Sequence, residues 1–175
     1  YLGDEETGRL PLYRFPYFSI PKCYTLLDLE ALQQTGISQM QNLPGLELSG
    51  EGVMIGFLDT GINYIDPVFR NLDGFTRILS IWDQTIPSPE NNGPFRYGTE
   101  YTSEQINKAL QSENPLSIVP STDTEGHGTM LAGIAAGSPE ENADFTGAAP
   151  LATLAVVKLK EAKQYLKDFY FFSGN

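Results

Sequence analysis

Two short strings contain the side chains best suited to do chemistry. The string VMIGFLDTGI ends an apolar run with Asp59, and the string GHGTMLAG holds His127, the one histidine of 175 residues. An aspartate can accept a hydrogen bond from one imidazole nitrogen and fix the tautomer, while the other nitrogen takes a proton from a nucleophile. Asp59 and His127 therefore supply two of the three members of a nucleophilic triad, provided that they meet in space.

Each of these residues also has a plainer interpretation. Asp59 could simply cap the turn made by Thr60 and Gly61, and a lone histidine is more often structural than catalytic. Asp-Thr-Gly also occurs in aspartic proteases, whose sites need two such loops, but Ile62 follows here and no second copy exists. Glycines on both sides of His127 weaken the structural interpretation, because they let other backbone approach the ring.

Strands and helices alternate in the predicted pattern, which indicates an α/β fold with parallel strands. Strands are expected at 53–58, 76–82 and 152–159, and helices at 26–34, 102–112 and 127–137, with 160–170 helical or irregular. Asp59 would then lie at the carboxyl end of a buried strand, where open α/β sheets place their sites. His127 would open a helix of small residues, and a helix start disfavours imidazolium, so we expect a neutral ring.

Several further expectations concern single segments and residues. Residues 83–101 contain several prolines and glycines and are predicted to be a loop. The 102–112 helix has Thr102 and Gln105 at capping-box spacing and is interpreted as a surface insertion. Trp82 is expected in the core. Thr60 and Thr129 are expected to support the two motif turns by hydrogen bonds.

Composition excludes some classes of protein. A net charge of −11 argues against nucleic-acid binding, and no apolar run approaches the ~18 residues of a membrane span. Cys23 is a lone cysteine, so no internal disulfide is expected. The chain begins at Tyr1 without a methionine, which we interpret as a processed piece with an extended arm over 1–24.

Three strings in order resemble the subtilase family of serine proteases. They are GEGVMIGFLDTGINYIDPVF (50–69), DTEGHGTMLAGIAAG (123–137) and FTGAAPLATLAVVKL (145–159). The resemblance places the catalytic aspartate on Asp59 and the catalytic histidine on His127. It implies a subtilisin-like three-layer fold with a mainly parallel sheet, present only in part. Within the family, the 83–118 insertion and the string STDTEGHGT resemble the clostridial spore-germination subtilases.

The resemblance also predicts a division of the chain. Residues 1–45 would be an N-terminal arm and helix, either the tail of a propeptide or the mature N-terminus. Residues 46–175 would be the N-terminal portion of a subtilase catalytic domain. The compartment is not readable from the sequence, although the resemblance is compatible with a secreted, spore or cell-envelope protein.

The family's nucleophile lies in a Gly-Thr-Ser-x-Ala string, which this chain lacks. Ser138 ends the histidine helix, and Ser173 has no such motif, so we expect the serine beyond Asn175. The resemblance thus implies a fragment of a serine endopeptidase, inactive as this piece alone because a triad member is missing. The alternative is a catalytically inactive subtilase relative that acts as a binding or signalling module.

The resemblance implies no cofactor for catalysis. Structural calcium is known in the family, but the loop acids form no recognisable calcium loop and are interpreted as solvated; they are Asp66, Asp73, Asp83 and Glu90. The expected partners are a protein or peptide substrate and the remainder of the subtilase domain. Without that remainder, we expect free strand edges and an exposed apolar face.

Overall fold

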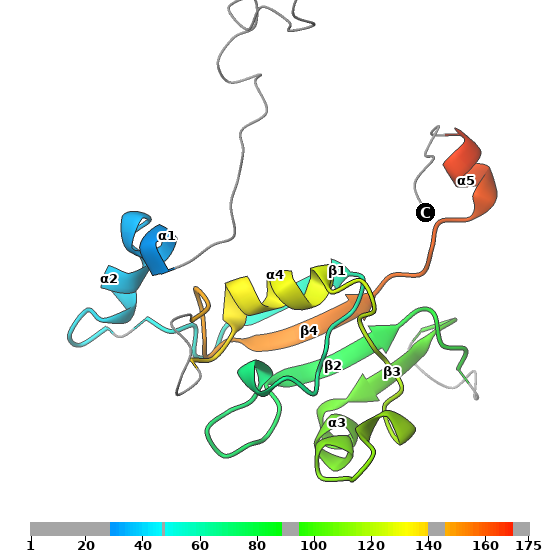
Figure 1. Ribbon diagram of the computed structural model, residues 1–175, viewed down its shortest axis with the longest axis horizontal. Coiled ribbons are helices and arrows are strands. Elements are labelled where there is room, and N and C mark those ends of the chain that lie inside the picture. Colours follow the sequence, from blue (N-terminus) through cyan, green and yellow to red (C-terminus); the bar gives the residue numbers. More distant parts are fainter. Residues whose placement is uncertain (1–28, 47, 89–94, 140–145, 170–175) are drawn as a thin grey trace, which may run out of the picture.

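The structure is a computed structural model that describes residues 29–46, 48–88, 95–139 and 146–169 (Figure 1). Its four strands are β1 (Met54–Asp59), β2 (Ile78–Asp83), β3 (Thr99–Thr102) and β4 (Thr153–Lys158). Its helices are α1 (Leu29–Gln34), α2 (Ile37–Gln41), α3 (Ser103–Leu110), α4 (His127–Ala136) and α5 (Gln164–Phe169), with 3-10 turns at Pro67–Phe69 and Pro115–Ser117. The predicted arm over 1–24, with Cys23, lies outside the described residues.

The four strands form one sheet in the order β1-β4-β2-β3. β1, β4 and β2 run parallel, and β3 is antiparallel to β2. The register pairs Asp59 with Lys158 and Lys158 with Asp83, so these three side chains end neighbouring strands at the carboxyl edge. The predicted α/β fold with a mainly parallel sheet is confirmed.

The strand and helix predictions hold within one or two residues at most ends. The exception is β3, which lies inside the segment predicted to be a loop. Its four residues, TEYT, include β-branched and aromatic side chains, and they pair with the edge of β2 that β4 leaves free. The prolines and glycines of the preceding segment hid this short strand from sequence reasoning. Gly36, predicted to stop the first helix, separates α1 from the short helix α2.

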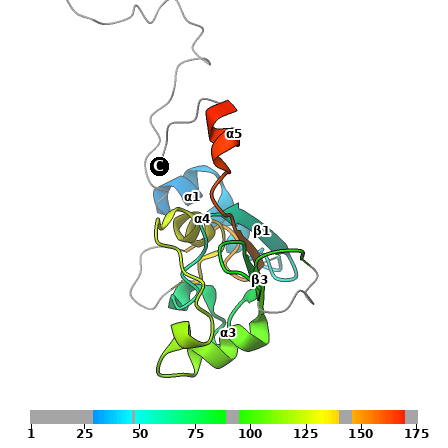
Figure 2. The same cartoon turned by 90° about the vertical axis from the view of Figure 1, so that its right-hand side faces the viewer.

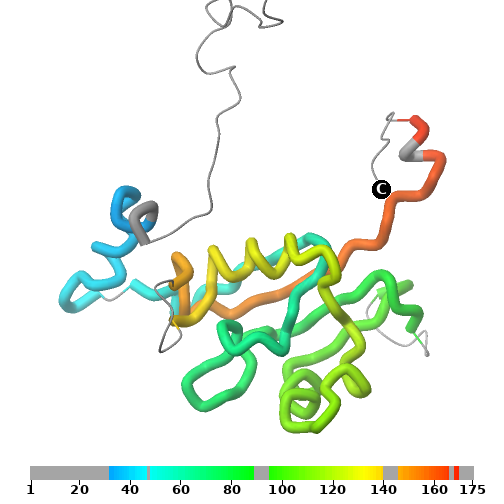
Figure 3. Tube along the Cα trace, viewed as in Figure 1, coloured from blue at the N-terminus to red at the C-terminus, as the bar shows by residue number. Residues whose placement is uncertain are grey.

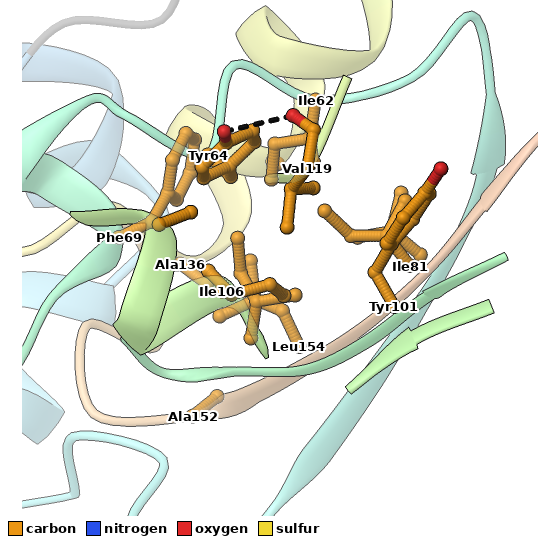
Figure 4. Close-up of a cluster of buried hydrophobic side chains, with 14 residues drawn as sticks. Ile62, Tyr64, Phe69, Ile81, Tyr101, Ile106, Val119, Ala136, Ala152 and Leu154 are labelled. Atoms are coloured by element: carbon orange, nitrogen blue, oxygen red, sulfur yellow. Dashed lines mark hydrogen bonds between the residues drawn. The ribbon is translucent and has the colours of Figure 1, made fainter. Parts of the chain in front are cut away.

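The hydrophobic core lies on one face of the sheet, beneath α3 and α4. Figure 4 shows Ile81 and Leu154 of the sheet packed with Ile106 of α3 and Ala136 of α4. The Tyr64 hydroxyl donates to the Val119 carbonyl at 2.9 Å at one end of this cluster (Figure 4). The core therefore fixes both helices relative to the strands.

Helix α3 lies on the surface with one face against this core, so the expected surface helix is present, and its origin as an insertion stays a prediction. Ile106 and Ala109 are fully buried beneath it. The predicted capping box is present, since the Thr102 N–H donates to the Gln105 side chain at 2.9 Å. The i, i+3 spacing of the two buried residues gives α3 one apolar face, which packs on β2 and β3.

The other face of the sheet is apolar and open. Met54 and Leu58 point from β1 toward this side, and 58% and 67% of their surfaces are exposed. The helices of the described residues that pack on the sheet are α3 and α4, and both lie on the core face. Figure 2 shows α5 standing away from the sheet. This open face agrees with the expected exposed apolar surface.

Helices α1 and α2 lie at one end of the sheet (Figure 1). The Gln41 amide at the end of α2 donates to the carbonyls of Gly147 and Ala148, at 2.9 and 3.0 Å. These bonds tie α2 to the segment that leads into β4. The predicted domain boundary after residue 45 stays a prediction.

Candidate active site

Asp59 and His127 meet at the carboxyl edge of the sheet. Asp59 is the last residue of β1, and His127 is the first residue of α4. His127 Nδ1 lies 2.8 Å from Asp59 Oδ1, a hydrogen-bond distance. The Asp59 side chain is 17% exposed and the imidazole 56% exposed. Nδ1 is thus held by the carboxylate, while the ring remains open to solvent.

Helix α4 is fixed at both ends, which positions the imidazole. At its C-terminus, the buried guanidinium of Arg77 donates to the carbonyls of Val68, Ala136 and Ala152. At its N-terminus, the turn after β1 packs directly on the backbone of the first helical turn. Ala132 and Ala136 of the helix are fully buried against the core, and Gly133 and Ala135 are half-buried. The prediction of a small-residue helix packed tightly on the sheet is confirmed.

The two glycines around His127 do different things. A Cβ on Gly128 would lie 2.2 Å from the Gly61 carbonyl oxygen, so this position needs glycine for close backbone approach. Gly126 has φ 81 and nothing within 4 Å of a Cβ built there. Its glycine instead permits the left-handed conformation that starts the helix. The expectation of close approach on both sides therefore holds for Gly128 and is wrong for Gly126.

A third carboxylate, Asp123, lies behind the pair. Its Oδ1 accepts from the Thr60 hydroxyl at 2.8 Å and from Gly126 N at 2.9 Å. Its Oδ2 accepts from Thr129 N at 2.8 Å and from the Thr129 hydroxyl at 2.6 Å. The predicted supporting hydrogen bonds of Thr60 and Thr129 are confirmed. Sequence reasoning missed Asp123, although an aspartate shortly before a helix start is a recognisable capping signal.

The hydrogen bonds shift the pKa values of all three groups. Burial raises the pKa of Asp59, but bonds from His127 and from Thr60 N outweigh burial and leave the pKa below its usual value. Burial likewise opposes ionisation of Asp123, yet the bonds from Thr129, Thr60 and Gly126 lower its pKa to about 2. Both carboxylates are therefore ionised at neutral pH.

The pKa of His127 is raised above its usual value. The hydrogen bond that Nδ1 donates to Asp59 is the main cause, and the charges of Asp59, Asp123 and Glu125 also raise the pKa. A helix start by itself lowers the pKa of a histidine, as we expected, whereas the carboxylate 2.8 Å away acts in the opposite direction and raises it.

Asp83 is buried, so its interpretation as a solvated loop acid is wrong. It ends β2 with no exposed surface and accepts from Thr85 N, the Thr85 hydroxyl and the Ser121 hydroxyl. Lys158 Nζ lies 3.8 Å from its Oδ2. The sequence alone could not show that this acid faces a neighbouring strand and loop rather than water.

The other acids interpreted as solvated have local roles or are outside the structure. Asp66 caps the 3-10 turn by accepting from Val68 N, and Asp73 accepts from Phe75 N in its own loop. Glu90 lies outside the described residues. Among the described residues, no three His, Cys, Asp or Glu side chains gather as a metal ion would require.

Trp82 lies outside the core, contrary to expectation. Its ring stacks on Phe95 at 4.0 Å between centroids, and its Nε1 donates to the Tyr97 carbonyl at 2.9 Å. Trp82 belongs to the open face because it neighbours Ile81 and Asp83, which both point the other way and are buried. In a strand, the side chain between two core residues must leave on the opposite face.

A hollow of about 450 Å³ opens beside Asp59. Its lining includes Leu58 of β1 and Thr60 of the following turn, Glu125 before the histidine, Lys158 at the end of β4 and Lys160 after it. Acidic and basic side chains therefore both line the hollow.

No serine of the described residues completes a triad here. Ser138 lies past the far end of α4, where its hydroxyl donates to the Arg70 carbonyl and its N–H to the Val68 carbonyl. Ser173 lies outside the described residues. None of the described helices is long and apolar enough to cross a membrane.

Comparison with known proteins gives one family. The model of the Subtilase family, Peptidase_S8, matches residues 50–169. Subtilisin-like protease SBT2.3 of Arabidopsis thaliana is 32% identical over 137 residues, 65% of this chain and 15% of its own length. Subtilisin-like protease SBT3.6 of the same plant is 31% identical over 68% of this chain and 17% of its own length.

A solved structure agrees with this family. The Clostridium perfringens CspB protease is 40% identical and superposes with a TM-score of 0.63, over 75% of this chain and 25% of that chain. The chain therefore spans about a sixth of the curated relatives it matches and a quarter of the solved structure.

Proposed function

Because this chain belongs to the subtilase family of serine proteases, we propose that it supplies the aspartate and histidine of an Asp-His-Ser triad in a serine endopeptidase. The single observation that carries the proposal is the 2.8 Å contact between Asp59 Oδ1 and His127 Nδ1. The similarity to a protease from Clostridium perfringens supports the clostridial branch of the family.

Each member of the pair has a separate role in this proposal. Asp59 accepts from Nδ1, which selects the tautomer whose Nε2 is unprotonated and able to take a proton. His127 is the general base that removes the proton of the serine hydroxyl and then returns it to the leaving amine. The ionised Asp59 stabilises the imidazolium formed in between, and its lowered pKa keeps it charged.

The serine comes from chain beyond Asn175 in this proposal. Two features support a missing part: the chain spans about 15% of its first relative, and β1 has one unpaired edge within the described sheet. The open face, with Met54 and Leu58 largely exposed, would be covered by the same remainder of the domain. Protein or peptide substrate would then lie across the hollow beside Asp59.

The test uses the longer protein that contains this chain and the serine segment. Hydrolysis of a fluorogenic peptide, sensitive to a serine-directed inhibitor, is expected from the longer protein. H127A and D59A should lower kcat by about 10⁴-fold, because triad members act as a unit. D73N, which removes a carboxylate bonded in its own loop, is the matched control and should keep full activity.

The 175-residue chain alone is expected to show no inhibitor-sensitive turnover. Turnover by this chain would contradict a nucleophile outside it. A longer protein that neither turns over peptide nor reacts with a fluorophosphonate, yet binds a protein partner, would contradict the enzyme and support the inactive binding or signalling relative.

A further inference from the structure

Asp123, in the segment before α4, makes hydrogen bonds to the residues next to Asp59 and His127. Asp123 accepts four hydrogen bonds with two oxygens, and its donors come from both elements that carry the pair. Thr60 directly follows Asp59, whereas Gly126 and Thr129 flank His127. One carboxylate therefore joins the turn after β1 to the first turn of α4.

The Thr60 hydroxyl makes this connection two-sided. It donates to Asp123 at 2.8 Å and accepts from Gly128 N at 3.0 Å. Thr129 extends the connection, because its hydroxyl accepts from Asn63 N at 2.9 Å. Asp59 and His127 are thus each next in sequence to a residue of the same hydrogen-bond network.

Asp123 itself is anchored to the sheet through the two residues before it. The Ser121 hydroxyl donates to the buried Asp83 at 2.6 Å, and the Thr122 carbonyl accepts from Lys158 Nζ at 2.6 Å. These partners end β2 and β4. Figure 3 follows the chain from α3 past the ends of these strands into α4. The Asp123 carboxylate therefore has a fixed place relative to the strand that carries Asp59.

We propose that Asp123 is a positioning residue for the Asp59–His127 pair, acting through Thr60, Gly126 and Thr129 to set the Nδ1 to Oδ1 contact. The importance of Asp123 for catalysis rests on the proposed function. Its effect on the Asp59–His127 geometry does not. Without the four bonds, the turn after β1 and the start of α4 lose their shared acceptor. The imidazole then leaves Asp59 and rotates in solvent, since more than half of it is exposed.

Asparagine at 123 is a sharp test because it keeps the shape and removes acceptors. Each carboxylate oxygen takes two donors, so the amide nitrogen of Asn would face two N–H or O–H groups that it cannot accept from. Loss of charge alone must be separated from loss of bonds. The carboxylates whose charge acts on His127 are Asp59 from β1 and Asp123 and Glu125 from the preceding loop. E125Q is therefore the charge control.

The single histidine makes the readout unambiguous. In the 175-residue chain labelled with ¹⁵N-histidine, the nitrogen chemical shifts report the tautomer of the neutral ring and its pKa without any assignment. The wild-type chain is expected to hold the Nδ1–H tautomer. D123N should lower the Nδ1–H fraction by about twofold or more and lower the pKa of His127. E125Q should lower the pKa while keeping the tautomer.

Three outcomes would overturn the proposal. The first is a D123N chain that keeps both the wild-type tautomer and pKa, with its backbone amide spectrum still dispersed. The second is an E125Q chain that loses the tautomer as D123N does, which would mean that charge alone is responsible. If D123N does not fold, T60V and T60S decide the question. T60V should lose the Nδ1–H tautomer and T60S should keep it. The third outcome that would overturn the proposal is that T60V and T60S behave alike.

These readouts need no nucleophile. A longer protein without peptidase activity would contradict the proposed function and leave the role of Asp123 intact. An unchanged tautomer in D123N would contradict the positioning role and leave the proposed function intact. The two failures are thus distinguishable.

Discussion

The Asp59 carboxylate is expected to control the titration of His127. D59N removes the nearest charge and replaces an acceptor that raises the pKa of the imidazole. We therefore expect the pKa of His127 to fall in D59N, toward the ordinary value of a histidine. NMR titration of the single imidazole measures this directly. D73N carries the same chemical change in another loop and should leave the His127 titration curve where it is.

Asp123 should make the folded state sensitive to acid. Its pKa is lowered to about 2 from 3.8, so between these pH values the unfolded chain binds a proton that the folded chain does not. Its contribution to the free energy of unfolding is present above about pH 4 and is lost as pH falls through about 2. After allowance for solvent screening we expect this contribution to be about 1–2 kcal/mol.

Urea titrations of the wild type and D123N between pH 6 and pH 2 test this expectation. The difference in unfolding free energy between the two chains should shrink as pH falls. D73N controls for the loss of one negative charge. Parallel curves for wild type and D123N over the whole range would show that the Asp123 carboxylate has no such linkage.

The Asp59–His127 pair could be predicted from residue types, whereas the hydrogen bonds that support it could be predicted only in part. An aspartate after an apolar strand and a histidine at a helix start are visible in the sequence, because each depends on local pattern. The links of Asp123 to Thr60 and of Asp83 to Ser121 are not visible, since these partners are 63 and 38 residues away, although Asp123 also carries a local capping signal. Long-range hydrogen bonds of this kind appear only once strand order and register are known.

At the scale of elements, the approach of α4 to the turn after β1 depends on one missing Cβ. G128A would place a methyl group 2.2 Å from the Gly61 carbonyl oxygen, a contact that only backbone movement can relieve. We expect a loss of about 2–3 kcal/mol in unfolding free energy, and loss of the Asp59–His127 contact. Thermal unfolding and histidine NMR measure these two effects.

G133A is the matched control within the same helix. A Cβ at Gly133 meets nothing within 4 Å, and alanine favours the helix by up to about 1 kcal/mol. This variant should be as stable as the wild type or more so. A G128A chain as stable as G133A would contradict the close packing of helix and turn.

Elements with a strong local pattern were predictable, and those defined by pairing were not. β1 and α4 follow from a continuous apolar run and from a stretch of small residues after glycine. β3 is four residues long and exists because β2 offers it an edge, which local sequence does not reveal. The apolar spacing of α3 was visible in the sequence, but only the packing shows that Ile106 and Ala109 both reach the core.

At the scale of the molecule, the open sheet face should make this chain self-associate. Apolar surface of this kind on an isolated chain is a site of association. L58K places a charge on that face, where Leu58 is 67% exposed. We expect the association constant to fall by about tenfold or more, because burial of one leucine contributes about 1.5–3 kcal/mol. Sedimentation equilibrium gives the constant.

L72K is the control for added charge. Leu72 is fully exposed in the 70–76 loop, away from the sheet face, so this variant should associate like the wild type. Equal association constants for L58K, L72K and wild type would show that the open face is not the contact surface.

The place of β4 in the sheet determines when the Asp59–His127 contact can form during synthesis. β4 is the last of the four strands to be synthesised, yet it lies between β1 and β2 in the sheet. Within the described residues, β4 is the strand that β1 pairs with. On the ribosome, β2, β3 and α3 can associate early because they are close in sequence, whereas β1 waits for residues 153–158. A nascent chain that stops before Thr153 thus carries both Asp59 and His127 without a sheet edge to align them. The site therefore cannot assemble before residues 153–158 have been synthesised.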